Sequence, residues 1–225
     1  MTDNRGRIRL RERRPATGRR RLAMKPGRVL FYGLALAFLA MGVISGALAV
    51  NVLPGTMMAE TMEALEEAMH AWQGGRTAAA RDLLTESLWT HLRTAGLLWI
   101  CGLSLFGLPV IALLLFLRGF SLGFTAGALV YRLGLEGLVL GVTALFPPNL
   151  FLIPALCLLG GQGFFLALAR HLGRDGPSPD ALRGRVLAHA AVGLVAVLLL
   201  LLGSLTEGAL VPVFLSWIAP LLGRA

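Results

Sequence analysis

Residues 102–155 read GLSLFGLPVIALLLFLRGFSLGFTAGALVYRLGLEGLVLGVTALFPPNLFLIPA, a stretch too apolar and too long for one core helix of a soluble domain. It also contains glycines, charged residues and prolines that would interrupt a regular membrane helix. In hydrocarbon every backbone donor and acceptor must be paired inside the protein, so a broken helix is tolerated only where neighbouring helices pack on it or where it lines a wet cavity. We therefore expect this stretch to form a broken helical region around which the rest of the chain packs. The interrupting residues are Gly119, Gly123, Gly127, Arg132, Glu136, Pro147, Pro148 and Asn149.

Composition and charge support a membrane location. The chain has 225 residues, of which 56% are hydrophobic, and its formal net charge is +9. Residues 1–28 contain eleven Arg and Lys against two acids, which is 11 − 2 = +9, so the remaining chain is neutral at 10 − 10 = 0. Basic arms can neutralise nucleic-acid phosphates, but here an apolar run begins at Val29. We therefore interpret residues 1–28 as a disordered cytoplasmic arm that contacts anionic lipid, and expect no nucleic-acid partner.

The apolar runs predict an all-α, polytopic membrane protein with about five transmembrane helices in a single membrane domain, residues 29–222. The predicted spans are residues 29–53, 95–117, 119–135, 149–169 and 186–205. Residues 136–146 are too short to cross and are predicted to form a re-entrant or interfacial half-helix ending at Pro147-Pro148. Gly42 and Gly46 form a GxxxG pattern in the first span, which like the later glycines favours close contact between helices.

The hydrophilic segments set the predicted orientation. Arg118 and the basic loop 170–185 are both expected on the cytoplasmic side, and an even number of crossings between them satisfies this. Residues 54–93 have no positive excess and are predicted to form an outer amphipathic helical hairpin, broken at Gly74-Gly75, with its second helix starting near Thr77. This hairpin either lies on the membrane surface or docks an extracytoplasmic partner. The candidate docking residues are Met62, Leu65 and Met69.

The sequence contains no catalytic constellation. It has no phosphate loop, no nucleophile followed by a base at useful spacing, and no metal-ligand spacing among its histidines. We therefore expect no enzymatic activity, no cofactor and no metal. Glu136 is the only acid deep in the apolar half of the chain. Such a residue is either functional or caps the half-helix beside Arg132, and the sequence favours the cap.

Taken together, these features resemble the stage II sporulation protein M (SpoIIM) family over about residues 31–222. The resemblance implies a multi-pass scaffold in the cell membrane that holds stage II sporulation proteins P and D at the septum during forespore engulfment. Those partners cut cell-wall peptidoglycan. The long Arg-rich arm departs from what we expect of shorter members. The resemblance rests on the first span followed by Asn51, the run Leu108-Pro109 to Arg118-Gly119-Phe120, the motif Gly134-Leu135-Glu136-Gly137-Leu138, and Pro147-Pro148-Asn149 leading to Ile153-Pro154-Ala155.

A second function class stays open. Small-solute transporters also use broken half-helices with an embedded acid. Against transport, no inverted repeat is visible, and the predicted spans hold few polar groups that could bind a solute. Membrane lipids and membrane-anchored wall hydrolases are the expected partners, and a homo-oligomer is also compatible with the sequence.

Overall fold

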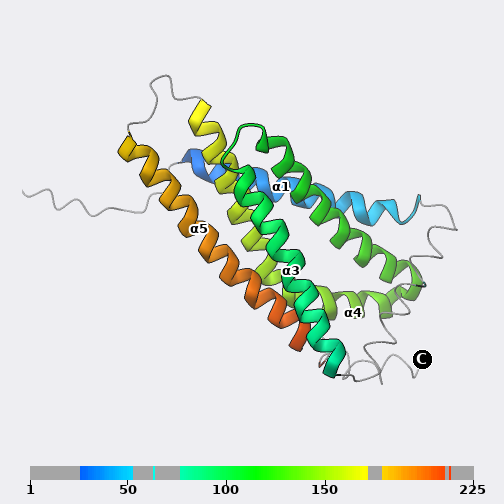
Figure 1. Ribbon diagram of the computed structural model, residues 1–225. Helices are drawn as coiled ribbons and strands as arrows, with labels where there is room; N and C mark the ends of the chain where they lie inside the picture. Colours follow the sequence, from blue (N-terminus) through cyan, green and yellow to red (C-terminus); the bar gives the residue numbers. More distant parts are fainter. Residues whose placement is uncertain (1–25, 53–62, 64–76, 172–178, 211–212, 214–225) are drawn as a thin grey trace, which may run out of the picture.

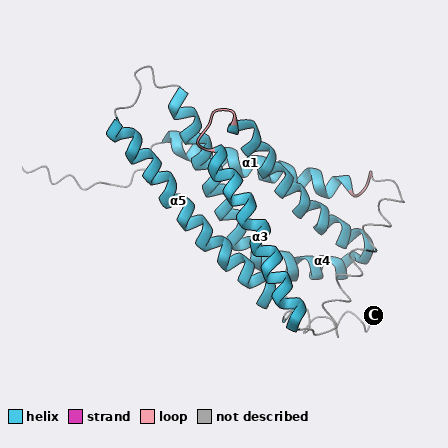
Figure 2. Ribbon diagram, in the orientation of Figure 1, coloured by secondary structure: helices cyan, strands magenta, loops and turns pink. Residues whose placement is uncertain are grey.

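The chain folds into a bundle of long helices (Figure 1). The computed structural model describes residues 26–52, 63, 77–171, 179–210 and 213. Within those residues every regular element is helical, as predicted, and Figure 2 shows helices joined by turns without a strand. The elements are α1 (Pro26–Ala49), α3 (Thr77–Cys101), α4 (Gly107–His171), α5 (Pro179–Leu205) and the π-helix η1 (Thr206–Leu210).

Three helices are long and apolar enough to cross a membrane, namely Val29–Ala49, Gly107–Leu168 and Arg183–Ala209. This is the composition of an integral membrane protein. The helix α3 is not among the three, since it carries Asp82, Glu86 and Arg93.

The helix α4 reverses direction at Gly134. This glycine has φ 58° and ψ −127°, a backbone conformation open to glycine and closed to residues with a Cβ. It divides α4 into a first limb, residues 107–133, and a second limb, residues 135–171, which fold back on each other (Figure 1). The two limbs are in backbone contact directly beside the reversal, because a Cβ on Gly137 would overlap the backbone carbonyl of Leu129.

The predicted break at Pro147-Pro148-Asn149 is wrong. Pro147 and Pro148 lie inside the second limb, so residues 136–146 do not form a separate half-helix. Proline has no N–H, and the carbonyls four residues earlier lose their helical donors. These are the carbonyls of Thr143 and Ala144, and the Nδ2 group of Asn149 donates at 2.7 Å to the next carbonyl, that of Leu145. The limb bends here rather than ending, after the stretch that carries the α4 label in Figure 1.

The predicted second span, residues 95–117, is also wrong. The helix α3 ends at Cys101, and a turn over residues 102–106 leads into Gly107 with the chain running back. The turn is closed by hydrogen bonds from Ser104 N to Cys101 O and from Gly107 N to Ser104 O, both 3.1 Å. A Cβ on Gly107 would overlap the Cys101 carbonyl, so glycine is required at this place. Arg118 therefore lies within the first limb and not at a helix end.

The predicted hairpin over residues 54–93 is corrected in its second half. A helix does start at Thr77, but it continues to Cys101 as α3 and lies along α5 and η1 (Figure 1). The first half of the hairpin, with Met62, Leu65 and Met69, lies outside the described residues, as does the basic arm up to residue 25.

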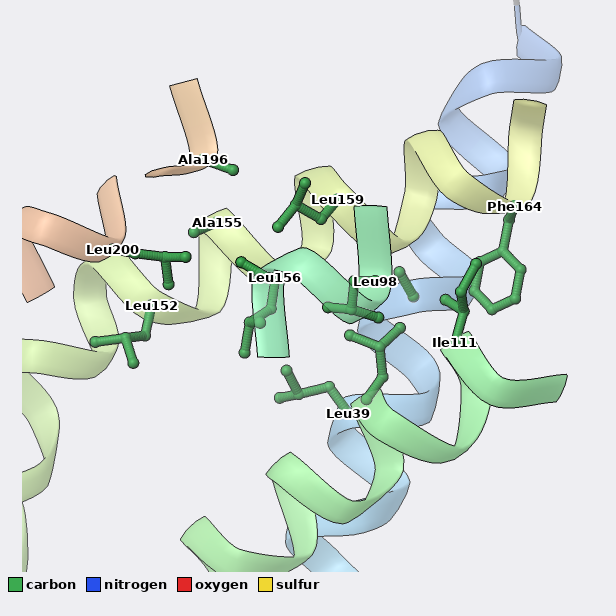
Figure 3. Close-up of a cluster of buried hydrophobic side chains, with 13 residues drawn as sticks. Leu39, Leu98, Ile111, Leu152, Ala155, Leu156, Leu159, Phe164, Ala196 and Leu200 are labelled. Carbon is green, nitrogen blue, oxygen red and sulfur yellow. The ribbon is translucent and has the colours of Figure 1, made fainter. Parts of the chain in front are cut away.

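The apolar core joins all four long helices (Figure 3). Leu39 comes from α1, Leu98 from α3, Ile111 from the first limb, Leu152 and Leu159 from the second, and Leu200 from α5; none is more than 3% exposed. Because contributors come from every helix, the bundle is one packing unit, and the remaining polar groups are held between fixed elements.

Candidate functional site

A glycine seam joins α1 to the first limb of α4. A Cβ on Gly42 would lie 2.8 Å from Phe120 N, and one on Gly46 would lie 2.8 Å from Phe124 N. From the other side, a Cβ on Gly123 would lie 2.7 Å from the carbonyl carbon of Val43. Gly119 faces Leu39 and Gly127 faces Ala47 in the same manner. The partners 39/119, 43/123 and 47/127 advance together, so α1 and the first limb run parallel with their backbones in contact, the geometry that small residues permit between membrane helices.

A polar cluster lies between α3 and the end of α5. Ser87 and His91 are one turn apart on α3, and Glu207 lies in η1. The hydroxyl of Ser87 donates to Oε2 of Glu207 at 2.6 Å, and Nε2 of His91 lies 3.2 Å from the same oxygen. The hydroxyl of Ser204 lies 3.4 Å from that of Ser87. His91 is 5% exposed, whereas the Glu207 side chain is 40% exposed.

The π-helix positions the carboxylate. A π-turn is wider than an α-turn, and such turns are often found at functional sites. Here the hydroxyl of Thr206 donates to the carbonyl of Gly203 at 2.6 Å. A Cβ on Gly208 would overlap the side chain of Leu84, so η1 lies directly against α3. Glu207 is thereby turned toward the polar face of α3.

Arg118 adds a positive charge to this cluster from the first limb of α4. Its guanidinium interacts electrostatically with the Glu207 carboxylate. It does so through space, because the direct partners of that carboxylate are Ser87 and His91. The Nε atom of Arg118 is buried and has no hydrogen-bond partner among the residues that the structure describes. The helix α3, the first limb of α4 and the end of α5 with η1 therefore all contribute polar or charged groups to the cluster, which consists of Ser87, His91, Arg118, Ser204 and Glu207.

The cluster geometry does not form a nucleophile–base relay. In such a relay the base contacts the nucleophile's hydroxyl directly. Here Ser87 and His91 both contact one oxygen of Glu207 instead. The arrangement suits a fixed carboxylate with two donors, which links α3 to η1. Ionisable groups inside membrane spans are costly, and they usually mark a functional position.

A second polar contact pins α3 to α5 near the turn over residues 102–106. His189 is fully buried, and its Nε2 lies 3.0 Å from the carbonyl of Trp99, in the last turn of α3. Trp99 Nε1 donates to the carbonyl of His189 at 3.4 Å, and the two rings stack with centroids 5.4 Å apart. A carbonyl is an acceptor only, so Nε2 must carry the proton. The pair satisfies a carbonyl that a helix end leaves without a donor.

The structure does not bring the predicted broken-helix residues into this cluster. Arg132 is exposed and Glu136 is half-buried, one on each side of Gly134. Asn149 bonds within its own limb. Sequence analysis missed Ser87, His91, Arg118 and Glu207. The only local signal was the i, i+4 spacing of Ser87 and His91, and nothing local connects them to an acid about 120 residues later.

The fold and these contacts define a helical membrane protein with a glycine-packed seam and a polar cluster among its helices. Residues 35–216 match the family model described as stage II sporulation protein M, SpoIIM. The match spans well over half of the chain, which therefore belongs to the SpoIIM family. It includes the seam, both limbs of α4 and the polar cluster. Neither a curated protein nor a solved structure gives a significant match to the chain.

Proposed function

We propose that the protein is a non-enzymatic membrane scaffold that holds peptidoglycan-cutting partners at the septum during engulfment. The observation that carries this proposal is membership of the SpoIIM family over residues 35–216. By resemblance to that family, the expected partners are stage II sporulation proteins D and P. A closely packed bundle suits this role, because a scaffold must present fixed surfaces rather than a changing cavity.

The proposed topology has five crossings with the N-terminal arm in the cytoplasm. Two observations support it: α1 and the first limb run parallel, and the turn over residues 102–106 makes α3 antiparallel to that limb. The second limb then returns, and α5 crosses outward. Reporter fusions after Arg14, Gly75, Ser104 and Gly176 should read in, out, in, in. An outer signal at Ser104 would contradict the topology.

The same topology predicts where partners dock. Ser87, in the first half of α3, contacts Glu207, in the π-helix that follows α5. The start of α3 and the end of η1 therefore lie at the same end of the bundle (Figure 1). We propose that this end is extracytoplasmic and that residues 53–76 form the docking segment, as the spacing of Met62, Leu65 and Met69 suggests.

Affinity capture from membranes tests the scaffold proposal. The tagged full chain should retain membrane-anchored wall hydrolases, and replacing Met62, Leu65 and Met69 by Ser should reduce their recovery without changing insertion. A matched control replaces Glu63, Glu66 and Glu67 by Gln, which alters polar positions of the same segment. Equal loss of hydrolase recovery in both triple variants would contradict an apolar docking face. Failure of the unaltered chain to capture any hydrolase would contradict the scaffold proposal.

A small-solute transporter is the second candidate, and the charges of Arg118 and Glu207 within candidate spans favour it. Under transport these charges act on a solute, so Glu207→Gln abolishes the cellular function while hydrolase capture persists. Under the scaffold proposal Glu207→Gln weakens function only as far as it weakens the bundle. Glu136→Gln should leave function intact in the scaffold, since Gln keeps much of the hydrogen bonding of a helix cap.

A further inference from the structure

Arg118 is a cation with one hydrogen-bond donor, Nε, that no described residue of the bundle satisfies. A guanidinium carries five N–H donors in a planar fork. The Nε donor of Arg118 is buried, and the described part of the chain offers it no acceptor. Glu207 balances the charge at a distance, but its Oε2 already accepts from Ser87 and contacts His91. An unsatisfied buried donor in a native protein calls for an explanation, and a missing ligand is one.

The depth of Arg118 restricts what that ligand can be. The neighbouring Gly119 touches Leu39, which is the middle residue of the candidate span Val29–Ala49. Arg118 therefore lies near the centre of the apolar layer, about 15 Å from either surface. A lipid phosphate stays at the surface. A carboxylate can reach this depth when a second membrane helix carries it.

The face of the first limb beside Arg118 is open to such a helix. Leu113, Leu117 and Ser121 are exposed and follow one another at four-residue spacing, with Leu113 and Leu117 at 55% and 50%. Residues at this spacing form one stripe along a helix. Arg118 is adjacent to the stripe in sequence and only partly exposed. A helix lying on the stripe therefore passes beside residue 118, whose side chain is partly exposed.

We propose that Arg118 is the docking point for a transmembrane helix of a partner protein that carries an Asp or Glu near its middle. The inference rests on the proposed scaffold function and specifies how one class of partner is held. The guanidinium fork binds a carboxylate through two parallel hydrogen bonds. The apolar stripe contributes contact area, and the charge pair selects the partner and its depth.

Model peptides test this without a natural partner. Three Leu/Ala-rich membrane peptides differ at one central residue, which is Glu, Gln or Leu. Each is labelled and titrated against the labelled full chain in lipid nanodiscs, and energy transfer gives the dissociation constant. We expect the Glu peptide to bind about tenfold more tightly than the Leu peptide, equivalent to about 1.4 kcal/mol, with Gln between them.

Variants of the full chain locate the interaction. Arg118→Met should remove the preference for Glu over Leu, whereas Arg132→Met, at an exposed arginine of the same limb, should retain it. If Arg118→Met does not insert, Arg118→Lys replaces it and should weaken the preference, because Lys lacks the fork. Unchanged preference in the Lys variant overturns the proposal in that case.

Three further results would overturn the proposal. The first is equal affinity for the Glu and Leu peptides, the second is a preference that survives Arg118→Met, and the third is displacement of the Glu peptide by an unlabelled second copy of this chain. The third would assign the site to self-association. Since no wall hydrolase is present in this assay, its failure leaves the capture experiment standing, and a failed capture leaves the peptide result standing.

Discussion

The substitution Gly123→Ala tests the seam between α1 and α4 with the smallest available change. The added Cβ would overlap the carbonyl oxygen of Val43, the atom nearest to it, and would lie 2.7 Å from the carbonyl carbon. Ordinary contact begins at 3.4 Å, so the two backbones must separate by at least 0.7 Å, the difference between these distances. The obstacle is backbone, which cannot rotate away as the end of a side chain can.

The expected loss of stability follows from that separation. A radial gap of about 0.5–1 Å forfeits roughly a quarter to a half of each dispersion contact along the seam. Overpacking of this kind typically costs about 1–3 kcal/mol. Alanine regains up to about 1 kcal/mol of helix propensity over glycine. Subtracting a gain of about 1 kcal/mol from a cost of about 1–3 kcal/mol leaves an expected net loss of up to about 2 kcal/mol.

Equilibrium unfolding in mixed micelles, followed by helical ellipticity, measures the effect. Gly33→Ala is the matched control, because Gly33 lies in α1 and a Cβ there meets nothing within 4 Å. The control should be neutral or slightly stabilising through propensity alone. If Gly123→Ala and Gly33→Ala unfold at the same denaturant concentration, α1 and α4 are not packed through this glycine and the seam is misassigned.

The other predictions use the same unfolding measurement. Gly134→Ala should lose about 1–3 kcal/mol from backbone strain alone, since the space around it is empty; no loss would show that the reversal lies elsewhere. Trp99→Phe removes the indole donor to His189 and should lose about 1 kcal/mol, whereas Trp89→Phe at an exposed position should change stability by less than 0.5 kcal/mol. Glu207→Gln should lower the free energy of unfolding by at most about 1 kcal/mol, because the side chain is partly exposed. An equal loss from Glu86→Gln, on the exposed surface of α3, would argue against a specific cluster.

Sequence reasoning located the membrane helices better than it located their ends. The apolar runs predicted α1 and α5 closely, and a helix start near Thr77. The turn over residues 102–106 escaped because Leu103, Leu105 and Phe106 are as apolar as the helices beside it. Apolar side chains in a turn that faces lipid cost no solvation free energy, so such a turn has the same composition as the helices beside it. Phe106 is 87% exposed, in agreement with this explanation.

The predicted break failed for a different reason. Proline ends most helices in water, but neighbouring helices and polar side chains allow it inside membrane helices. Pro147 and Pro148 lie within the second limb with Asn149 beside them. Gly134 carries the reversal instead, and one glycine among the many in these runs gives no distinguishing pattern. The required backbone angles are visible only in three dimensions.

The polar cluster could not be predicted by any local pattern. Glu207 lies 120 residues from Ser87 and 116 from His91. The sequence pointed instead to Glu136, because it is surrounded by apolar residues. The π-helix then turns Glu207 back toward α3, a local departure from α-geometry that the sequence TEGAL does not indicate.

The parallel seam also sets an order of events during synthesis. Its partners 39/119, 43/123 and 47/127 are each 80 residues apart. A ribosome adding about 5–20 residues per second needs about 4–16 s to synthesise the α4 side of the seam after the α1 side. For that interval α1 must remain in the bilayer or beside the insertion machinery with its glycines uncovered. Even in the finished bundle only 22% of the apolar part of α1 is buried. Lipid can therefore solvate α1 before the first limb of α4 is made. A chain that stalls before residue 119 would leave α1 unpaired in the membrane, as a substrate for membrane proteases.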